Sequence, residues 1–316
     1  MNQYPVVFLL GPTACGKTAS SILLAEQLNA EIVSVDSALV YRDMNIGTAK
    51  PDSKERAGIA HHLIDVCDPD EAYSVARFCD DALRIIDDIQ RRNKLALLTG
   101  GTMLYFNALE KGIAPLPDAN AELREVLSKE AETIGWPGMH KKLARIDPLA
   151  AERIHPNDPQ RLQRALEVHQ LTGQALSDLQ KNTKPLLPVP PLKFALLPDS
   201  RAWLHERISR RFVQMLDNGF LDEVRDIQQK YAVKADMPSM RSVGYRQAWQ
   251  HLAGEYDQHS MIDKAQAATR QLAKRQMTWI RSMDGLNALS CDKLEVAEQV
   301  ETMITVCTQQ LPKTDL

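Results

Sequence analysis

The sequence predicts an α/β fold, in which a parallel sheet is flanked by helices and the chain carries an inserted all-α subdomain. Short β-rich runs predict strands at residues 5–10, 31–35, 95–99 and 193–197. Helical patterns follow the first three strands at residues 17–28, 75–92 and 102–110, an alternation typical of βαβ units. From about Asp118 to Gln180 only helical patterns occur, between two proline-rich stretches. We therefore expect a core of residues 1–115 plus 190–316 and an inserted helical subdomain at 116–189.

The composition is that of an ordinary globular protein, with 316 residues of which 44% are hydrophobic and 25% charged. No apolar stretch approaches the roughly 20 residues needed to cross a bilayer. The N-terminus lacks the cationic flank of a signal peptide, so we expect a cytoplasmic protein. The five cysteines include no C-x-x-C pair, which disfavours a disulfide framework or a zinc site. No exposed seam demands a partner subunit, and we expect a monomer.

A phosphate loop follows the first strand. Residues 11–18 read GPTACGKT directly after an apolar run. Gly11 and Gly16 let backbone N–H groups converge on phosphate oxygens, Lys17 adds a positive charge, and the Thr18 hydroxyl can bind Mg²⁺. The helix that begins here points its positive end at the anion. The motif predicts a P-loop NTPase-like fold, but it fits a nucleotide such as ATP as well as a diphosphate that departs as a leaving group.

The ends of the next two strands carry further candidate residues. The strand at 31–35 ends in Asp36 and Ser37, which therefore emerge at the same edge of the sheet as the phosphate loop. A carboxylate there can hold a metal, accept a proton, or simply cap a helix. The third strand ends in LALLTGG without an acid, which disfavours a nucleotide hydrolase. Thr102 follows Gly100 and Gly101, where its hydroxyl can contact a substrate or cap a helix.

Cationic residues gather in the insertion and in the C-terminal helices. Arg161 and Arg164 share one face of the helix that Asp158 caps and Pro159 begins. Arg207, Arg210 and Arg211 lie within one helical turn, where they are either in reach of a diphosphate or simply solvated, the commoner fate of arginines. From Arg201 to Arg281 there are 14 Lys and Arg against 9 Asp and Glu. This excess suits a polyanion, although solvated helix faces produce similar counts.

Two C-terminal segments suit RNA. The loop at 238–246 mixes arginines, small hydroxyls and a tyrosine, a composition that fits a single-stranded base and its backbone. In the helix at 268–283, a wheel at about 100° per residue places Arg270, Lys274 and Arg281 on one face. Trp279 falls on the opposite, apolar face, so we expect it in the core. The cationic face suits a phosphate backbone.

Six sequence blocks together closely resemble the bacterial tRNA dimethylallyltransferase family. In order they read GPTACGKT, SVDSALVYRDMNIGTAKP, LLTGGTMLYF, HPNDPQRLQRALEV, RSVGYRQ and ATRQLAKRQMTWIR. The resemblance runs from about Val6 to Arg281. One departure is Cys15, where the family usually shows Ser, and we expect little effect because this loop binds through its backbone. No zinc-finger extension of the eukaryotic type follows the last helix.

The resemblance implies transfer of a dimethylallyl group from dimethylallyl diphosphate to N6 of the adenine 3′-adjacent to the tRNA anticodon. Pyrophosphate is then the leaving group, and Mg²⁺ at Thr18 is the implied cofactor. Asp36 resembles the general base that takes the N6 proton. Lys17 and Thr18 neutralise the diphosphate, while Thr102 and Arg211 help to hold the base and the diphosphate respectively. The implied diphosphate-binding residues are Gly11, Pro12, Thr13, Ala14, Cys15, Gly16, Lys17, Thr18 and Arg211.

The implied tRNA contacts come from four segments and two single residues, and the insertion grips the anticodon stem-loop. They are Asp36, Ser37, Ala38, Leu39, Thr102, Arg124, Gln160, Arg161, Leu162, Gln163, Arg164, Arg241, Ser242, Val243, Gly244, Tyr245, Arg246, Lys274, Arg275, Gln276, Met277, Thr278, Trp279, Ile280 and Arg281.

Three other functions fit part of the sequence. A small-molecule phosphoryl transferase explains the phosphate loop and the sheet, but it gives no role to the cationic C-terminal segments. An adenylate prenyltransferase uses similar chemistry on a free nucleotide. A nucleotide-gated RNA-binding protein without catalysis needs no general base. The sequence also leaves open whether ATP binds the phosphate loop.

Overall fold

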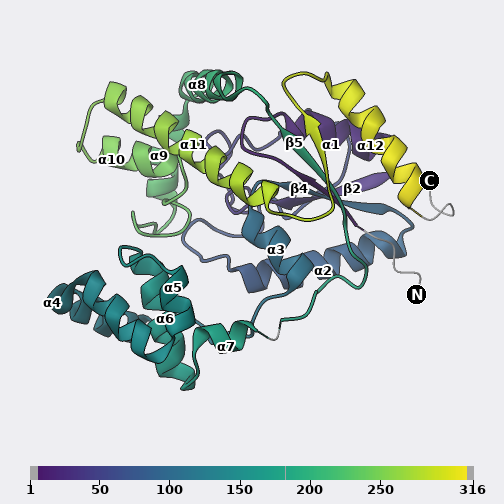
Figure 1. The fold of residues 1–316 in the computed structure, drawn as a ribbon. Coiled ribbons are helices and arrows are strands. Elements are labelled where there is room, and N and C mark those ends of the chain that lie inside the picture. Colours follow the sequence, from purple (N-terminus) through teal and green to yellow (C-terminus); the bar gives the residue numbers. More distant parts are fainter. Residues whose placement is uncertain (1–5, 182, 312–316) are drawn as a thin grey trace. The chain divides into compact units, whose positions relative to one another are not determined.

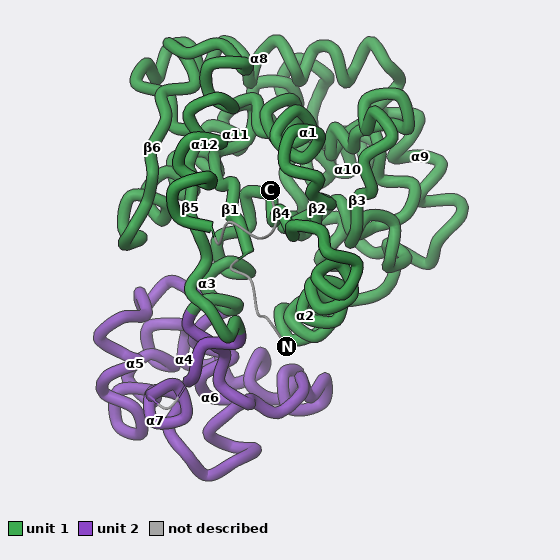
Figure 2. Tube along the Cα trace, turned by 90° about the vertical axis from the view of Figure 1, so that its right-hand side faces the viewer, with its two compact units in different colours: residues 1–110, 187–316 green, residues 111–186 purple. Residues whose placement is uncertain are grey.

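The structure is a computed structural model that describes residues 6–181 and 183–311. It divides into two compact units, coloured separately in Figure 2. Unit 1 comprises residues 1–110 and 187–316, and unit 2 comprises residues 111–186. The chain enters and leaves unit 2 a few residues before the boundaries expected from the proline-rich stretches. No helix among the described residues is long and apolar enough to span a bilayer.

Unit 1 is built on a parallel sheet of six strands (Figure 1). Their order is β3-β2-β4-β1-β5-β6, which can be followed by the strand labels of Figure 2. The strands are β1 Val7–Leu10, β2 Ala30–Val35, β3 His61–His62, β4 Leu95–Gly100, β5 Leu192–Leu197 and β6 Leu286–Ser290. Every residue of β1 and β2 is buried, as expected for a parallel sheet covered on both faces. The predicted fold class and the four predicted strands are confirmed.

Two strands were not predicted. β3 has only two residues, His61 and His62, and both are half-buried. β6 reads LNALS, in which only Leu289 is buried and Ala288 is exposed. A run this short or this polar has no apolar pattern of its own. Both strands form because β2 and β5 offer a free edge, which a single-sequence pattern does not reveal.

Helices cover both faces of this sheet, and further helices of unit 1 pack on one another. The helices of unit 1 are α1 Lys17–Gln27, α2 Val75–Arg91, α3 Met103–Lys111, α8 Arg201–Asp217, α9 Phe220–Lys230, α10 Tyr245–Leu252, α11 Gln258–Arg281 and α12 Val296–Gln310. Val7 and Leu9 belong to the same apolar cluster as Leu24 of α1 and Met303 of α12. The intervening Phe8 points the other way and contacts Phe106 of α3, with ring centroids 4.8 Å apart.

All regular secondary structure among the described residues of unit 2 is helical. Its helices are α4 Ala121–Ile146, α5 Pro148–Arg153, α6 Pro159–Thr172 and α7 Leu176–Gln180. The Asp158 side chain accepts a hydrogen bond from Arg161 N and caps α6, whose first residue is Pro159. Both features were predicted. Leu127, Leu143, Leu162 and Leu166 form the centre of the unit's own hydrophobic core.

Candidate active site

The phosphate loop, residues 11–18, forms the turn between β1 and α1. Gly16 caps α1 in a left-handed conformation, with φ 99°, which glycine adopts without strain. A Cβ atom at Gly11 would lie 2.6 Å from Cys15 Sγ and 2.9 Å from Leu196 O, so only glycine fits. Lys17 Nζ donates to Gly11 O at 2.9 Å and to Pro12 O at 2.8 Å. The ammonium is thus held at the loop itself, where an anion would compete for it.

Two C-terminal helices fix the phosphate loop from outside. Gln276 of α11 accepts a hydrogen bond from Thr13 N at 2.9 Å and donates one to Gly101 O at 2.8 Å. Arg207 of α8 donates to Ala14 O at 2.8 Å and lies over the Trp203 ring, 4.7 Å from its centroid. One amide therefore ties the phosphate loop to the end of β4. Sequence reasoning assigned Gln276 to tRNA and missed this role.

The thiol of Cys15 belongs to the same loop. Its Sγ lies 3.8 Å from Lys17 Nζ. Burial raises the pKa of the Cys15 thiol, but a hydrogen bond with Cys291 and the Lys17 ammonium outweigh that effect and lower the pKa to about 6. The surroundings of the loop therefore favour the negatively charged thiolate of Cys15, although a cysteine with its ordinary pKa is neutral at pH 7.

Asp36 follows β2 and uses only one of its carboxylate oxygens within the protein. Oδ1 accepts from Ala38 N at 2.8 Å and from Leu39 N at 3.3 Å, which closes a turn of the Asx type. Oδ2 has no hydrogen-bond partner among residues 6–181 and 183–311. The side chain is half-buried. One oxygen thus fixes the orientation of the carboxylate, and the other is available to accept a proton.

Thr102 lies across from Asp36 at the end of β4. Its Oγ1 accepts from Ser37 N at 3.0 Å, and its backbone N–H donates to Val35 O at 3.1 Å. A Cβ atom at Gly100 would lie 2.0 Å from Val35 O, so the strand ends approach closely only because residue 100 is glycine. The structure therefore brings Asp36, Ser37 and Thr102 together, as their positions at the ends of parallel strands predicted.

Arg211 of α8 is a half-buried cation near this edge. Its Nη2 donates to Thr48 O at 3.2 Å. No carboxylate of the described chain lies within ion-pair distance of its guanidinium. Burial lowers the pKa of Arg211, while the charges of Asp36 and Cys15 act in the opposite direction. The guanidinium is thus within electrostatic range of both Asp36 and the phosphate loop. Arg210, by contrast, pairs with Glu206 on the exposed side of α8.

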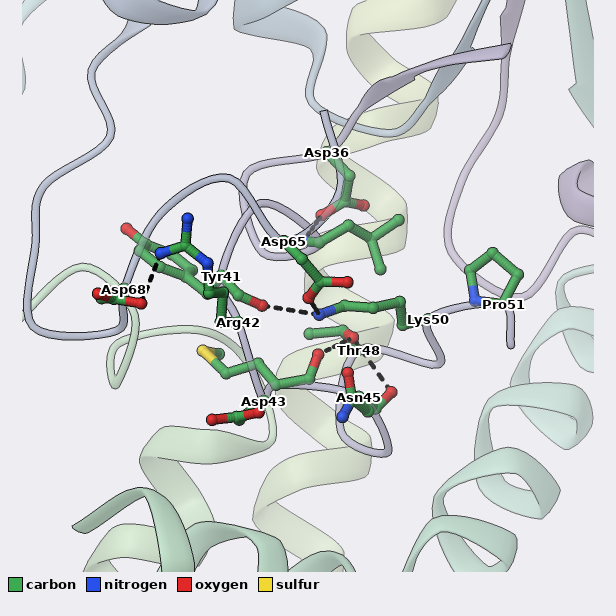
Figure 3. A network of polar contacts seen from close by, with 12 residues as sticks. Asp36, Tyr41, Arg42, Asp43, Asn45, Thr48, Lys50, Pro51, Asp65 and Asp68 are labelled. Carbon is green, nitrogen blue, oxygen red and sulfur yellow. Dashed lines mark hydrogen bonds and ion pairs between the residues drawn. The ribbon is translucent and has the colours of Figure 1, made fainter. Parts of the chain in front are cut away.

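A polar network organises the segment that follows Asp36 (Figure 3). Lys50 Nζ donates to Tyr41 O at 2.7 Å and to Asp65 Oδ1 at 2.5 Å, and only 3% of its side chain is exposed. Thr48 Oγ1 donates to Met44 O at 2.6 Å. Sequence reasoning took only residues 36–39 of this stretch as site residues. The signal that could have extended the site was the block MNIGTAKP, which combines a turn glycine with a lysine.

The cationic residues predicted in unit 2 are held largely by protein partners. Arg124 and Arg164 both bind the fully buried carboxylate of Glu167, at 2.9 Å and 2.7 Å. Gln163 Nε2 donates to Arg124 O and to Ser128 Oγ, both at 3.0 Å. Leu162 is fully buried in the core of the unit. Of this set, Arg161 is the arginine whose side chain is largely exposed, at 69%.

The two segments of unit 1 that were predicted to bind RNA contain both exposed and buried residues. Arg241 and Arg246 are exposed, whereas Gly244 and Tyr245 are buried; Ser242 and Val243 are intermediate. On α11 the exposed members are Lys274, Arg275, Thr278, Trp279 and Arg281, and the buried ones are Gln276, Met277 and Ile280. The prediction that Trp279 belongs to the core is wrong, because 42% of it is exposed. Ala273, Met277 and Ile280 form the buried face instead.

The residues at the phosphate loop fit a magnesium ion held mainly by phosphate oxygens. Thr18 is exposed and its hydroxyl lies at the start of α1. Within the described ranges no three His, Cys, Asp or Glu side chains group into a metal site. Mg²⁺ commonly keeps several waters and takes one or two protein ligands plus substrate phosphates. A single hydroxyl beside a diphosphate cradle is therefore a suitable donor set.

Comparisons with known proteins agree on one family. A family model described as IPP transferase matches residues 39–283. A tRNA dimethylallyltransferase of Methylococcus capsulatus is 56% identical over 88% of this chain and 89% of its own. That of Herminiimonas arsenicoxydans is 52% identical over 98% of this chain and 97% of its own.

Solved structures with similar folds bear related descriptions. A tRNA isopentenylpyrophosphate transferase of Bacillus halodurans superposes with a TM-score of 0.71 at 36% identity, covering 96% of both chains. A eukaryotic dimethylallyltransferase described as acting on tRNA gives a TM-score of 0.80 at 28% identity, covering 96% of this chain and 78% of the other.

Proposed function

The chain belongs to the IPP transferase family, and from this premise we propose that it is a tRNA dimethylallyltransferase. It transfers a dimethylallyl group from dimethylallyl diphosphate to N6 of the adenine 3′-adjacent to the anticodon and releases pyrophosphate. The observation that carries the proposal is the Asp36 carboxylate, in which Oδ1 is hydrogen-bonded to the backbone and Oδ2 has no partner among the described residues. This carboxylate lies beside Thr102 and within electrostatic range of Arg211. A base and a diphosphate cradle thus meet at one edge of the sheet.

The phosphate loop would hold the leaving group. Its backbone N–H groups, Lys17 and Arg211 stabilise the negative charge that grows on the diphosphate as its bond to the allylic carbon breaks. Mg²⁺ bound through Thr18 would supply further charge neutralisation there. Phosphorus itself is not attacked, so the loop needs no residue to activate water at the γ-phosphate.

Asp36 would act on the acceptor. The exocyclic amine of adenine is a poor nucleophile because its lone pair is delocalised into the ring. As the C–N bond forms, Oδ2 of Asp36 takes the N6 proton, while Oδ1 remains bonded to Ala38 N and Leu39 N and keeps the carboxylate in place. The Thr102 hydroxyl lies on the same side and would help to hold the base.

The adenine must leave its stack in the anticodon loop to reach this carboxylate, at a cost of a few kcal/mol. We propose that exposed cationic and aromatic residues recover that cost by binding the splayed loop. In unit 1 they are Arg241, Arg246, Lys274, Arg275, Trp279 and Arg281. Arg161 of unit 2 is a further candidate for the anticodon stem. We expect the enzyme to act as a cytoplasmic monomer.

The decisive assay supplies dimethylallyl diphosphate and Mg²⁺ with one of two acceptors, an unmodified anticodon stem-loop or AMP. The proposal expects pyrophosphate release with the stem-loop and none above background with AMP. Release with AMP alone would indicate an adenylate prenyltransferase. No release with either acceptor, combined with transfer of γ-labelled phosphate from ATP, would indicate a phosphoryl transferase.

A further inference from the structure

We propose that Glu223, on α9, is a positioning residue that fixes the segment at residues 45–48 and, through it, the guanidinium of Arg211. The inference rests on the proposed function, in which Arg211 binds the diphosphate. Glu223 itself touches neither the phosphate loop nor Asp36 through any hydrogen bond or ion pair of the described residues. Its effect on the reaction would therefore be indirect.

Three successive backbone N–H groups converge on the Glu223 carboxylate. Oε2 accepts from Asn45 N at 2.9 Å and from Ile46 N at 2.6 Å, and Oε1 accepts from Gly47 N at 3.1 Å. Consecutive amides aimed at one anion form a concave binding site for negative charge. The segment lies outside any helix or strand, so this carboxylate supplies the acceptors that regular secondary structure would otherwise provide.

A fourth donor links the same carboxylate to α10. Tyr245 Oη donates to Glu223 Oε1 at 2.5 Å. Burial, and then the negative charge of Glu223, raise the pKa of Tyr245 well above its ordinary value, so the phenol remains a donor. Gly47 packs directly on this aromatic group: a Cβ atom there would lie 2.2 Å from the Phe220 ring and 2.6 Å from the Tyr245 ring. The segment therefore has little room to shift.

The next residue along the chain holds Arg211. Thr48 O accepts from Arg211 Nη2 at 3.2 Å, which is the one side-chain hydrogen bond of Arg211 within the described part of the chain. The position of this carbonyl oxygen thus decides where the guanidinium lies relative to Asp36 and the phosphate loop. Figure 3 shows Asn45, Thr48 and Asp36 in the same stretch of chain. A shift of 45–48 would move the cation away from a diphosphate.

The neighbouring residue on α9 provides a matched control. Asp222 pairs with Arg225 at 2.5 Å, and 76% of its side chain is exposed. It therefore carries the same carboxyl chemistry on the same helix without contacting the 45–48 segment. Glu223→Gln is nearly isosteric, but an amide offers only one acceptor oxygen and turns its NH₂ group toward donors. Asp222→Asn makes the same chemical change on the exposed side.

The test measures binding of inorganic pyrophosphate with Mg²⁺ by calorimetry, alongside kcat/KM with dimethylallyl diphosphate and the stem-loop. We expect Arg211→Ala to weaken pyrophosphate binding ~30-fold and Glu223→Gln to weaken it ~10-fold, as for loss or displacement of one charged contact. The double variant should bind no more weakly than Arg211→Ala within about twofold, because both changes remove the same contact. Asp222→Asn should match wild type.

Three results would overturn the proposal. The first is a double variant whose loss of pyrophosphate affinity equals the product of the two single losses, which would mean that the residues act independently. The others are a Glu223→Gln variant that binds like Asp222→Asn, and an Arg211→Ala variant that binds like wild type. If circular dichroism shows that Glu223→Gln does not fold, Glu223→Asp replaces it, since it keeps the charge but shortens the reach. An inactive wild-type enzyme that still binds pyrophosphate would refute the proposed function and leave this coupling testable by calorimetry.

Discussion

The Asp36 side chain has a structural role in closing a turn and a proposed catalytic role as a base, and one substitution distinguishes them. Asparagine retains an acceptor for Ala38 N and Leu39 N and so preserves the turn, but it cannot take a proton. Asp36→Asn should therefore lower kcat by ~10²–10⁴ while the affinity for the stem-loop stays close to wild type. Single-turnover kinetics and a filter-binding assay measure the two quantities. If Asp36→Asn retained most of its activity, another group would have to be the base.

Gln276 was expected from the sequence to contact tRNA, whereas in the structure it binds the phosphate loop. The side-chain amide of Gln276 bonds to Thr13 N and Gly101 O. Gln276→Ala should therefore raise KM for dimethylallyl diphosphate about tenfold, because a partly buried N–H of the loop loses its acceptor. RNA affinity should change little. Arg275→Ala, on the exposed side of α11, should show the reverse pattern. Weaker RNA binding with an unchanged KM in Gln276→Ala would restore the original prediction of a tRNA contact.

The residues predicted well are those whose positions follow from topology alone. Asp36 and Thr102 come directly after strands of a parallel sheet, so their meeting at one edge needed no knowledge of side-chain packing. Gln276 and Glu223 act over long sequence separations, on partners at Thr13 and at residues 45–47. Nothing in the local pattern of a helix indicates such a partner. A glutamine or glutamate on an amphipathic helix usually faces solvent.

At the scale of elements, α11 shows why a helical wheel was insufficient. The wheel placed Trp279 inside because it lies opposite Arg270, Lys274 and Arg281. In the structure Ala273, Met277 and Ile280 pack inward, because the helix must also present Gln276 to the phosphate loop. Trp279 is left exposed one helical turn from Arg275, which is also exposed, and an exposed aromatic ring beside a cation suits an unstacked base.

Trp279→Ala should weaken binding of the anticodon stem-loop by ~5- to 100-fold, the range expected for loss of one stacked base. The melting temperature should hardly change, since the ring is 42% exposed. Gln258→Ala, at the exposed first residue of α11 and outside the predicted tRNA contacts, should leave RNA affinity unaltered. A clear fall in melting temperature with normal RNA affinity would mean that the tryptophan serves packing after all.

On β2, the buried carboxylate of Glu31 ties strand to helix. Arg92 Nη2 and His62 Nε2 lie 2.8 Å from its oxygens and Lys94 Nζ lies 3.0 Å away. The hydrogen bonds from Arg92 contribute most to holding the pKa of Glu31 well below its usual range, against the opposing effect of burial. Because the folded pKa is depressed, this stabilisation is fully present above the unfolded pKa of about 4.3.

Glu31→Gln should therefore lower the free energy of unfolding at pH 7 by ~1–3 kcal/mol. The difference from wild type should shrink as the pH falls below about 4 toward the depressed folded pKa. Urea unfolding between neutral pH and acid measures it, with exposed Glu26→Gln on α1 as the control. A difference that stayed constant through the acid range would contradict the ion-pair account.

At the scale of the whole molecule, the sequence predicted the sheet, the helices around it and the helical insertion. Long alternating elements carry strong periodic signals, and the phosphate loop fixes where the first strand ends. β3 and β6 were missed because their residues form strands only against neighbours already in place. The same limit applies to the site: the strand ends were foreseeable, whereas the support given by α8, α9 and α11 depends on how distant segments pack in unit 1.

The central claim is that the phosphate loop holds the departing diphosphate while Asp36 accepts a proton from N6 of the adenine. A single-turnover reaction with dimethylallyl diphosphate, Mg²⁺ and an anticodon stem-loop tests it most directly, followed by digestion of the RNA and mass spectrometry of its nucleosides. The account predicts one pyrophosphate for each N6-dimethylallyl adenine, located 3′ to the anticodon. Pyrophosphate formed without alkylated adenine, or alkylation at another base, would contradict it.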